Sequence, residues 1–149
     1  MAPGVFTATE YIRNQVGTFC FSGSGATYPW SMDNVRNYLT YVGTGISIDT
    51  HYNAVGYHED SLRDYTIEHL TKANQNERRP VIIGTGWLNH YPLAWGYSWR
   101  SRPTTWRDAG WWVGDDVLYS RYFYVNNGHG GSDDGWVDAS TWFAGRVSP

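Results

Sequence analysis

The chain has few of the residues that define several large classes of protein. Its 149 residues include one cysteine. That single cysteine, Cys20, excludes an internal disulfide framework and a zinc site built from cysteines. The net charge of −3 disfavours a nucleic-acid binder, because phosphate binding depends on clustered Lys and Arg. No apolar run approaches the roughly 20 residues that span a bilayer, so no membrane segment is predicted.

Lysine is almost absent, with Lys72 as the only one among eleven basic residues. A genome that prefers arginine codons would explain this, and so would a secreted effector or toxin that avoids lysine modification in a host cell. The N-terminus lacks the charged and then apolar pattern of a signal peptide. The cellular location stays open, with a secreted or extracellular one favoured.

Aromatic residues, in contrast, are abundant: 9 Trp, 12 Tyr and 5 Phe. They are typical of the core and rim of a small β-rich domain, or of a surface that stacks on sugars. The length suits one globular domain over residues 1–149.

Hydrophobic periodicity predicts an α+β fold, with N-terminal helices packed on a C-terminal antiparallel sheet. The run 81–83 is continuously apolar, which predicts a central, buried strand. Residues 100–115 are expected to form a Trp-rich loop or hairpin, and 126–135 a glycine-rich turn. The predicted helices are 9–16, 31–42 and 61–74. The predicted strands are 46–52, 81–83, 91–99 and 117–125, and residues 136–143 are predicted as a last strand or as a strand followed by a turn.

Two polar residues stand at the ends of neighbouring predicted strands. His90 comes at the start of one strand, and Asn126 comes at the end of the other, just before the glycine turn. An amide oxygen can accept a hydrogen bond from one ring nitrogen, which fixes the tautomer and turns the other nitrogen toward a nucleophile. Alternatively, Asn126 caps the turn, since asparagine tolerates left-handed backbone.

The residues around these two positions resemble the streptopain-type papain-like cysteine peptidases. Residues 123–136 read Phe-Tyr-Val-Asn-Asn-Gly-His-Gly-Gly-Ser-Asp-Asp-Gly-Trp, and the predicted strand that follows His90 contains Gly-Tyr. Asn127 stands where such enzymes usually carry Trp. The resemblance covers about residues 31–143. It implies a single papain-like domain in which His90 is the catalytic histidine and Asn126 orients it.

Cys20 is the only cysteine that could act as the nucleophile. It precedes His90 by 70 residues, a spacing similar to that of the compact bacteriocin-processing peptidases, which also resemble papain. Gln15 stands five residues upstream, close to where papain-like enzymes place the glutamine of the oxyanion hole. No helical pattern follows Cys20, and the alternative is an inert, buried thiol between two phenylalanines.

Two hypotheses from different classes follow. The first is a cysteine peptidase-like hydrolase or acyl transferase that acts on the peptide or amide bonds of a peptide or protein. It uses a Cys–His–Asn arrangement and needs no cofactor and no metal. The second is a catalytically inactive papain-like module that binds a protein or a glycan. Without a nucleophile helix, apolar sheet surface would stay exposed, and this version therefore predicts a homo-oligomer.

Overall fold

The computed structural model describes residues 3–21, 24–53, 59–85, 90–108, 111–128 and 131–148. Helices dominate the first half of the chain and strands the second, which confirms the α+β class. The elements are α1 (Pro3–Val16), β1 (Phe19–Phe21), β2 (Ser24–Ala26), the 3-10 helix η1 (Pro29–Asn34), α2 (Val35–Tyr41), β3 (Ser47–Tyr52), α3 (Glu59–Leu70), the 3-10 helix η2 (Gln75–Glu77), β4 (Val81–Ile83), β5 (Leu93–Asp108), β6 (Trp111–Asn126), β7 (Gly135–Asp138) and β8 (Phe143–Ser148).

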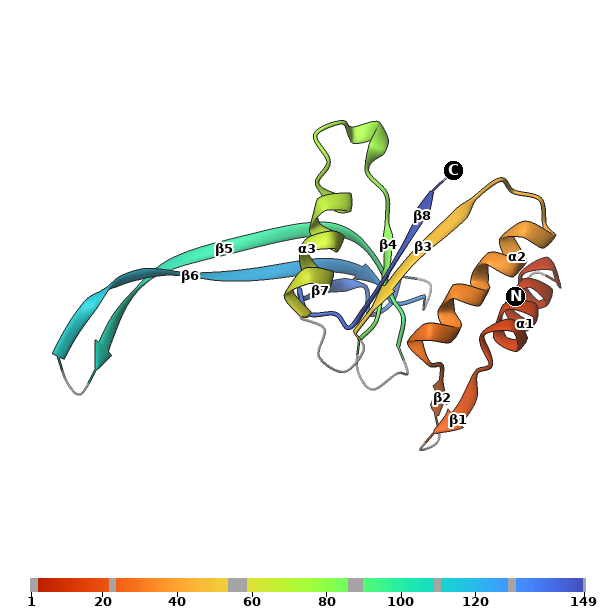
Figure 1. The fold of residues 1–149 in the computed structure, drawn as a ribbon, viewed down its shortest axis with the longest axis horizontal. Helices are drawn as coiled ribbons and strands as arrows, with labels where there is room; N and C mark the ends of the chain where they lie inside the picture. The colour runs from red at the N-terminus through yellow and green to blue at the C-terminus, as the bar shows by residue number, and fades with distance from the viewer. Residues whose placement is uncertain are drawn as a thin grey trace.

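Six strands form one antiparallel sheet in the order β3-β8-β4-β5-β6-β7, while β1 and β2 pair separately (Figure 1). The predicted central position of β4 is confirmed, because β4 lies between β8 and β5. Val81 and Ile83 have no exposed surface. Both side chains lie in the core cluster with α3, as expected for a buried central strand.

Of the two predictions for residues 136–143, a single strand is wrong and a strand followed by a turn is confirmed. Residues 135–138 form β7 at the edge of the sheet, and the chain then crosses to its middle, where β8 begins at Phe143. Periodicity reports which residues are extended, but it carries no information on which strand they lie beside. The place of β8 between β3 and β4 is therefore a property of the tertiary structure.

β5 and β6 form a ribbon that is longer than the sequence predicts. Their cross-strand pairs run from Leu93 with Asn126 to Asp108 with Trp111. β4 flanks only the first two residues of β5, and β7 flanks only four residues of β6. The rest of the ribbon projects beyond the other strands (Figure 1). The predicted loop or hairpin over 100–115 is thus the far end of a hairpin.

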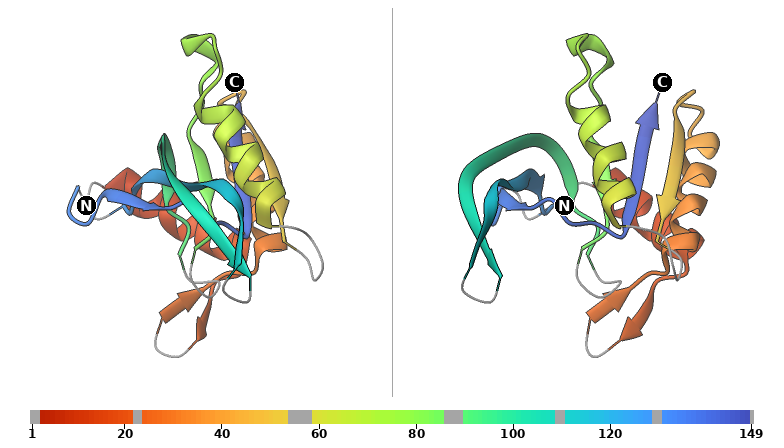
Figure 2. Two further views of the ribbon diagram at one scale, coloured as in Figure 1. Left: turned by 90° about the vertical axis from the view of Figure 1, so that its left-hand side faces the viewer. Right: turned by 60° about the vertical axis from the view of Figure 1, so that its left-hand side comes forward.

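Helices cover the two faces of the sheet (Figure 2). On one face, Leu62 and Leu70 of α3 pack in one cluster with Val81, Phe123 and other small or branched residues. The second cluster joins Val16 of α1, Met32 of η1 and Phe143 of β8. Neighbouring residues of a strand point to opposite faces, so successive residues of β8 reach different helices. The core therefore packs on both faces of β4 and β8, and the candidate site begins where β4 ends.

Candidate active site

His90 lies where the chain turns back from β4 toward β5. The N–H of Thr85 donates to the carbonyl oxygen of His90 at 3.0 Å, in an isolated β-bridge. The next side chain, Tyr91, packs edge-on against Trp142 with ring centroids 5.3 Å apart, and its hydroxyl donates to the carbonyl oxygen of Thr27. Burial raises the pKa of Tyr91, so the phenol remains a donor at neutral pH. The backbone at His90 is therefore anchored on both sides.

The side chain of His90 is held by Asn127. Its Nε2 lies 2.7 Å from Oδ1 of Asn127. Asn127 is itself held, because its backbone N–H donates to Oδ1 of Asp134 at 3.0 Å and its side-chain amide donates to the carbonyl oxygen of Asp133. With the amide nitrogen used as a donor, the amide oxygen faces the ring and can only accept, so Nε2 carries a proton. In the neutral ring, Nδ1 is then the basic nitrogen.

Nδ1 of His90 has no hydrogen-bond partner among the residues that the structure describes. The ring is half-buried and borders a hollow of about 530 Å³ between the ends of β4, β6 and β7. The hollow is lined by Gly84, Thr85, His90, Pro92, Val125, Asn127, Val137, Asp138, Ser140 and Trp142. A basic ring nitrogen beside a hollow of this size can take up a proton from a bound molecule.

The structure assigns to Asn127 the contact that the resemblance assigned to Asn126. The side-chain oxygen of Asn126 accepts a hydrogen bond from the N–H of Gly128 at 2.8 Å, which closes the turn after β6. Asn126 therefore takes the capping role that the sequence left open as an alternative. Because adjacent residues of an extended chain point to opposite sides, only one of the two asparagines can face His90.

The wall of the hollow is fixed by a buried threonine. Thr141, with 1% of its surface exposed, accepts a hydrogen bond from the N–H of Gly84 at 3.1 Å. Its hydroxyl lies within donating distance of two carbonyl oxygens, that of Phe143 at 2.5 Å and that of Gly84 at 3.0 Å. A Cβ on Gly84 would lie 2.8 Å from Cβ of Phe143 and 2.9 Å from the ring of Trp142. Glycine is therefore required here for close packing.

Cys20 lies on the short hairpin of β1 and β2, where it pairs with Gly25 and is exposed. The predicted alternative of a buried thiol is wrong, since a three-residue strand with one neighbour leaves its side chains open to solvent. Thr18 and Thr27, at the base of the hairpin, join through their hydroxyls at 3.0 Å. Thr27 also accepts the hydroxyl of the tyrosine that follows His90. The base of the hairpin is therefore tied to the tip of Tyr91, the residue after His90.

The structure shows no hydrogen bond or ion pair between Cys20 and His90 within the described part of the chain. Gln15 lies in the last turn of α1, where its Oε1 accepts from the side chain of Asn37 at 3.1 Å and its carbonyl oxygen accepts from Asn34 at 3.1 Å. These contacts join α1 to η1 and α2. The structure thus brings together His90 and Asn127, and it places Cys20 and Gln15 on a separate N-terminal segment.

Sequence reasoning misses two residues of this site. Asn127 stands out in the sequence only as a departure from the family pattern, although a pair of asparagines at a strand end signals that one of them can face inward. Thr141 gives no signal, because a buried threonine and an exposed one look the same in a sequence.

No protein-family model, no curated protein and no solved structure matches this chain. Within the described residues, no helix has the length and apolar character needed to cross a membrane. No cluster of three or more His, Cys, Asp or Glu side chains suited to a metal ion occurs in that same part of the chain.

Proposed function

We propose that this chain is a cysteine peptidase-like hydrolase or acyl transferase that acts on peptide or amide bonds. The observation that carries the proposal is the 2.7 Å hydrogen bond between His90 Nε2 and Asn127 Oδ1. It leaves Nδ1 as a base beside a hollow large enough for a peptide segment. A histidine oriented in this way is the acid–base half of a thiol hydrolase.

In the proposed reaction, Nδ1 of His90 takes the thiol proton of Cys20, and the sulfur attacks the substrate carbonyl carbon. The S–C bond forms, and the C–N bond breaks as the His90 imidazolium returns its proton to the leaving amine. Water, or a second amine in acyl transfer, then attacks the thioester and releases the sulfur. Asn127 holds the imidazolium in place. The candidate oxyanion donors are the side chain of Gln15 and the backbone N–H of Cys20.

This mechanism requires the hairpin to bring the thiol to Nδ1. The Thr18–Thr27 and Tyr91–Thr27 bonds tie its base to the hydroxyl of Tyr91, the residue after His90. Cys20 lies two residues further along β1, or about 6.6 Å at the usual rise of a strand. Because these bonds lie at the base of the hairpin, a small change of its angle alters the position of the sulfur while the base stays fixed.

The test is the pH dependence of Cys20 alkylation by iodoacetamide, followed by intact mass. Since Cys20 is the single cysteine, one modification reports one site. A thiol activated by His90 reacts well below the ordinary cysteine pKa of about 8.5, and His90→Ala returns the profile to that value. His51→Ala is the matched control, because His51 is exposed and bonds to Asp49 on β3. Identical profiles in wild type and His90→Ala would refute the proposal.

A second candidate function is a non-catalytic papain-like module that binds a protein or a glycan. The projecting ribbon favours it, because Trp99 and Tyr119 are each 56% exposed and pair on one face with ring centroids 6.0 Å apart. The strand position of Cys20 favours it too, since a helix N-terminus that would lower the thiol pKa is not present there. An unreactive Cys20 together with a homo-oligomer in light scattering would support this candidate over the enzyme.

A further inference from the structure

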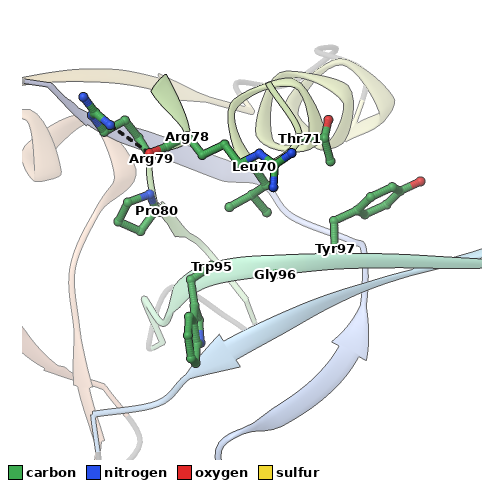
Figure 3. Close-up of a pocket in the computed structure, with 8 residues that line it drawn as sticks. All are labelled: Leu70, Thr71, Arg78, Arg79, Pro80, Trp95, Gly96 and Tyr97. Atoms are coloured by element: carbon green, nitrogen blue, oxygen red, sulfur yellow. Dashed lines mark hydrogen bonds between the residues drawn. The ribbon is translucent and has the colours of Figure 1, made fainter. Parts of the chain in front are cut away.

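A second hollow, of about 500 Å³, opens between the end of α3, the segment that leads into β4 and the first part of β5 (Figure 3). It is lined by Leu70, Thr71, Arg78, Arg79, Pro80, Trp95, Gly96 and Tyr97. The hollow borders the end of the β4–β5 ladder where Val81 pairs with Ala94, whereas His90 lies beyond the other end. It is therefore separate from the His90–Asn127 pair.

β5 has an open edge along this second hollow. β4 pairs with β5 only at Leu93 and Ala94, and the pairing of β5 with β6 then shifts register at Trp95. From Trp95 onward, no strand in the described part of the chain pairs with β5 on the side that faces β4. An open edge presents unpaired backbone N–H and C=O groups, to which an extended peptide can add as a further strand.

The charge at the second hollow is positive. Arg78 is exposed, and its Nε donates to the carbonyl oxygen of Lys72 at 2.8 Å. Its terminal nitrogens make no hydrogen bond with a described residue, and Figure 3 shows the guanidinium beside Leu70. Arg79 instead points away, with Nη1 donating to the carbonyl oxygen of Asn76 at 2.6 Å. None of the described lining residues is acidic, although the whole chain has a net charge of −3.

We infer that this hollow binds an extended acidic segment of a partner protein, which adds along the open edge of β5 and places a carboxylate on Arg78. The Nε bond holds the guanidinium with its two terminal nitrogens available, which suits the two oxygens of one carboxylate. Leu70 and Pro80 supply an apolar wall for an alternate side chain of the added strand. The inference requires neither Cys20 nor His90, so it goes beyond the proposed chemistry.

The probe is a fluorescein-labelled octapeptide of alternating Val and Asp, blocked at both ends, and the readout is fluorescence anisotropy. The protein carries Cys20→Ser, so that cleavage does not contribute. We expect the acidic peptide to bind and a Val–Lys counterpart to bind at least tenfold more weakly. Arg78→Gln should weaken binding of the acidic peptide about tenfold, and Arg78→Lys should restore part of it. Arg13→Gln, at an exposed position of α1 away from β5, is the matched control and should leave binding unchanged.

Strand addition is tested with a third peptide that is N-methylated at alternate residues, which removes backbone donors and should weaken binding about tenfold. Equal binding of the acidic peptide to wild type and Arg78→Gln would overturn the site, and so would equal binding of the basic peptide. Equal binding of the methylated peptide would overturn the strand-addition geometry. A dimer that dissociates in Arg78→Gln would overturn the partner protein in favour of a second copy. The alkylation profile of Cys20 bears on none of these outcomes.

Discussion

The two halves of the proposed site differ in how they are held. His90 and Asn127 lie next to strand ends, and the hydrogen bond that joins their side chains connects residues 37 positions apart in sequence. Cys20 lies on a hairpin of two three-residue strands with an exposed side chain. A general base can therefore be preorganised while its nucleophile is not. Under the proposed mechanism, the hairpin is therefore the element on which activity depends.

The physical origin of this difference is burial. The ends of β4 and β8 are covered by α3 on one face and α1 on the other, so their polar groups must be paired. The β1–β2 hairpin has no helix over it in the clusters that form the core of the described residues. Isolated two-stranded hairpins are marginally stable in water, and this one relies on its base contacts.

The largest difference in the free energy of unfolding is expected from removing one aromatic ring from the sheet and one from the β1–β2 hairpin. Phe143→Ala empties a fully buried position of β8 and should cost about 3–5 kcal/mol in the free energy of unfolding. Phe19→Ala removes a partly exposed ring that contacts Tyr28 at 4.8 Å and should cost about 1 kcal/mol. Urea denaturation measures both values. Equal losses in the free energy of unfolding would show that the hairpin is packed as tightly as the sheet.

Two threonines allow a matched test of hydrogen bonding. Thr141→Val removes a buried hydroxyl that bonds both the N–H and the C=O of Gly84, although these groups keep their backbone bonds to Phe143 and Trp142. The loss of more than one buried bond should cost about 1–2 kcal/mol. Thr18→Val removes one hydroxyl pair at the half-buried base of the hairpin and should cost about 0.5–1.5 kcal/mol. Thermal unfolding of the two variants gives the comparison, and a larger loss for Thr18→Val would reverse it.

The two asparagines separate orientation of the histidine from closure of the turn. Asn127→Ala should lower the alkylation rate of Cys20 at neutral pH about tenfold, because it removes the acceptor that holds the His90 imidazolium. Asn126→Ala should destabilise the turn after β6 and change the rate much less. A proton NMR titration of the His90 ring provides an independent readout. If Asn126→Ala has the larger effect on both, the assignment to Asn127 is wrong.

The smallest effect is a loss of stability at alkaline pH that comes from Tyr65 of α3, the helix that covers one face of the sheet. Burial, together with the Asp49 carboxylate that accepts its hydroxyl at 3.1 Å, raises the pKa of Tyr65 to about 12. The unfolded chain loses this proton near pH 10, so the contribution to stability is complete below pH 10 and disappears as the pH rises toward 12. Tyr65→Phe should flatten the fall in urea midpoint between these values. An unchanged slope in Tyr65→Phe would assign the fall to other groups.

Local patterns predicted much of the scaffold. The apolar run at 81–83 identified the central strand, and the helical periodicities located three helical segments with displaced ends. These succeed because the spacing of apolar side chains must match the face that an element buries. The placement of His90 at a strand start and of Asn126 just before a glycine-rich turn also follows from the sequence, since strand ends and glycine turns are local features.

The sequence does not decide between Asn126 and Asn127. Adjacent residues of a strand point to opposite faces, so the exact residue at which β6 ends decides which asparagine faces His90. The same holds for β8, whose place between β3 and β4 depends on a crossing of the chain that periodicity does not encode. The bonds that Thr141 makes with Gly84 join residues 57 positions apart in sequence. No local sequence pattern predicts a contact between residues this far apart.

The amino-acid sequence by itself determined the class of fold and the central strand. It also singled out His90 as a candidate site residue, with an asparagine at the end of β6 to orient it. Only the tertiary structure decided that Asn127 holds His90, that Cys20 lies on an exposed hairpin, and that β5 keeps an open edge beside Arg78. The physical reason is that secondary structure follows from the periodic burial of neighbouring residues. A site, in contrast, depends on which distant backbone segments the packed core brings within hydrogen-bond distance.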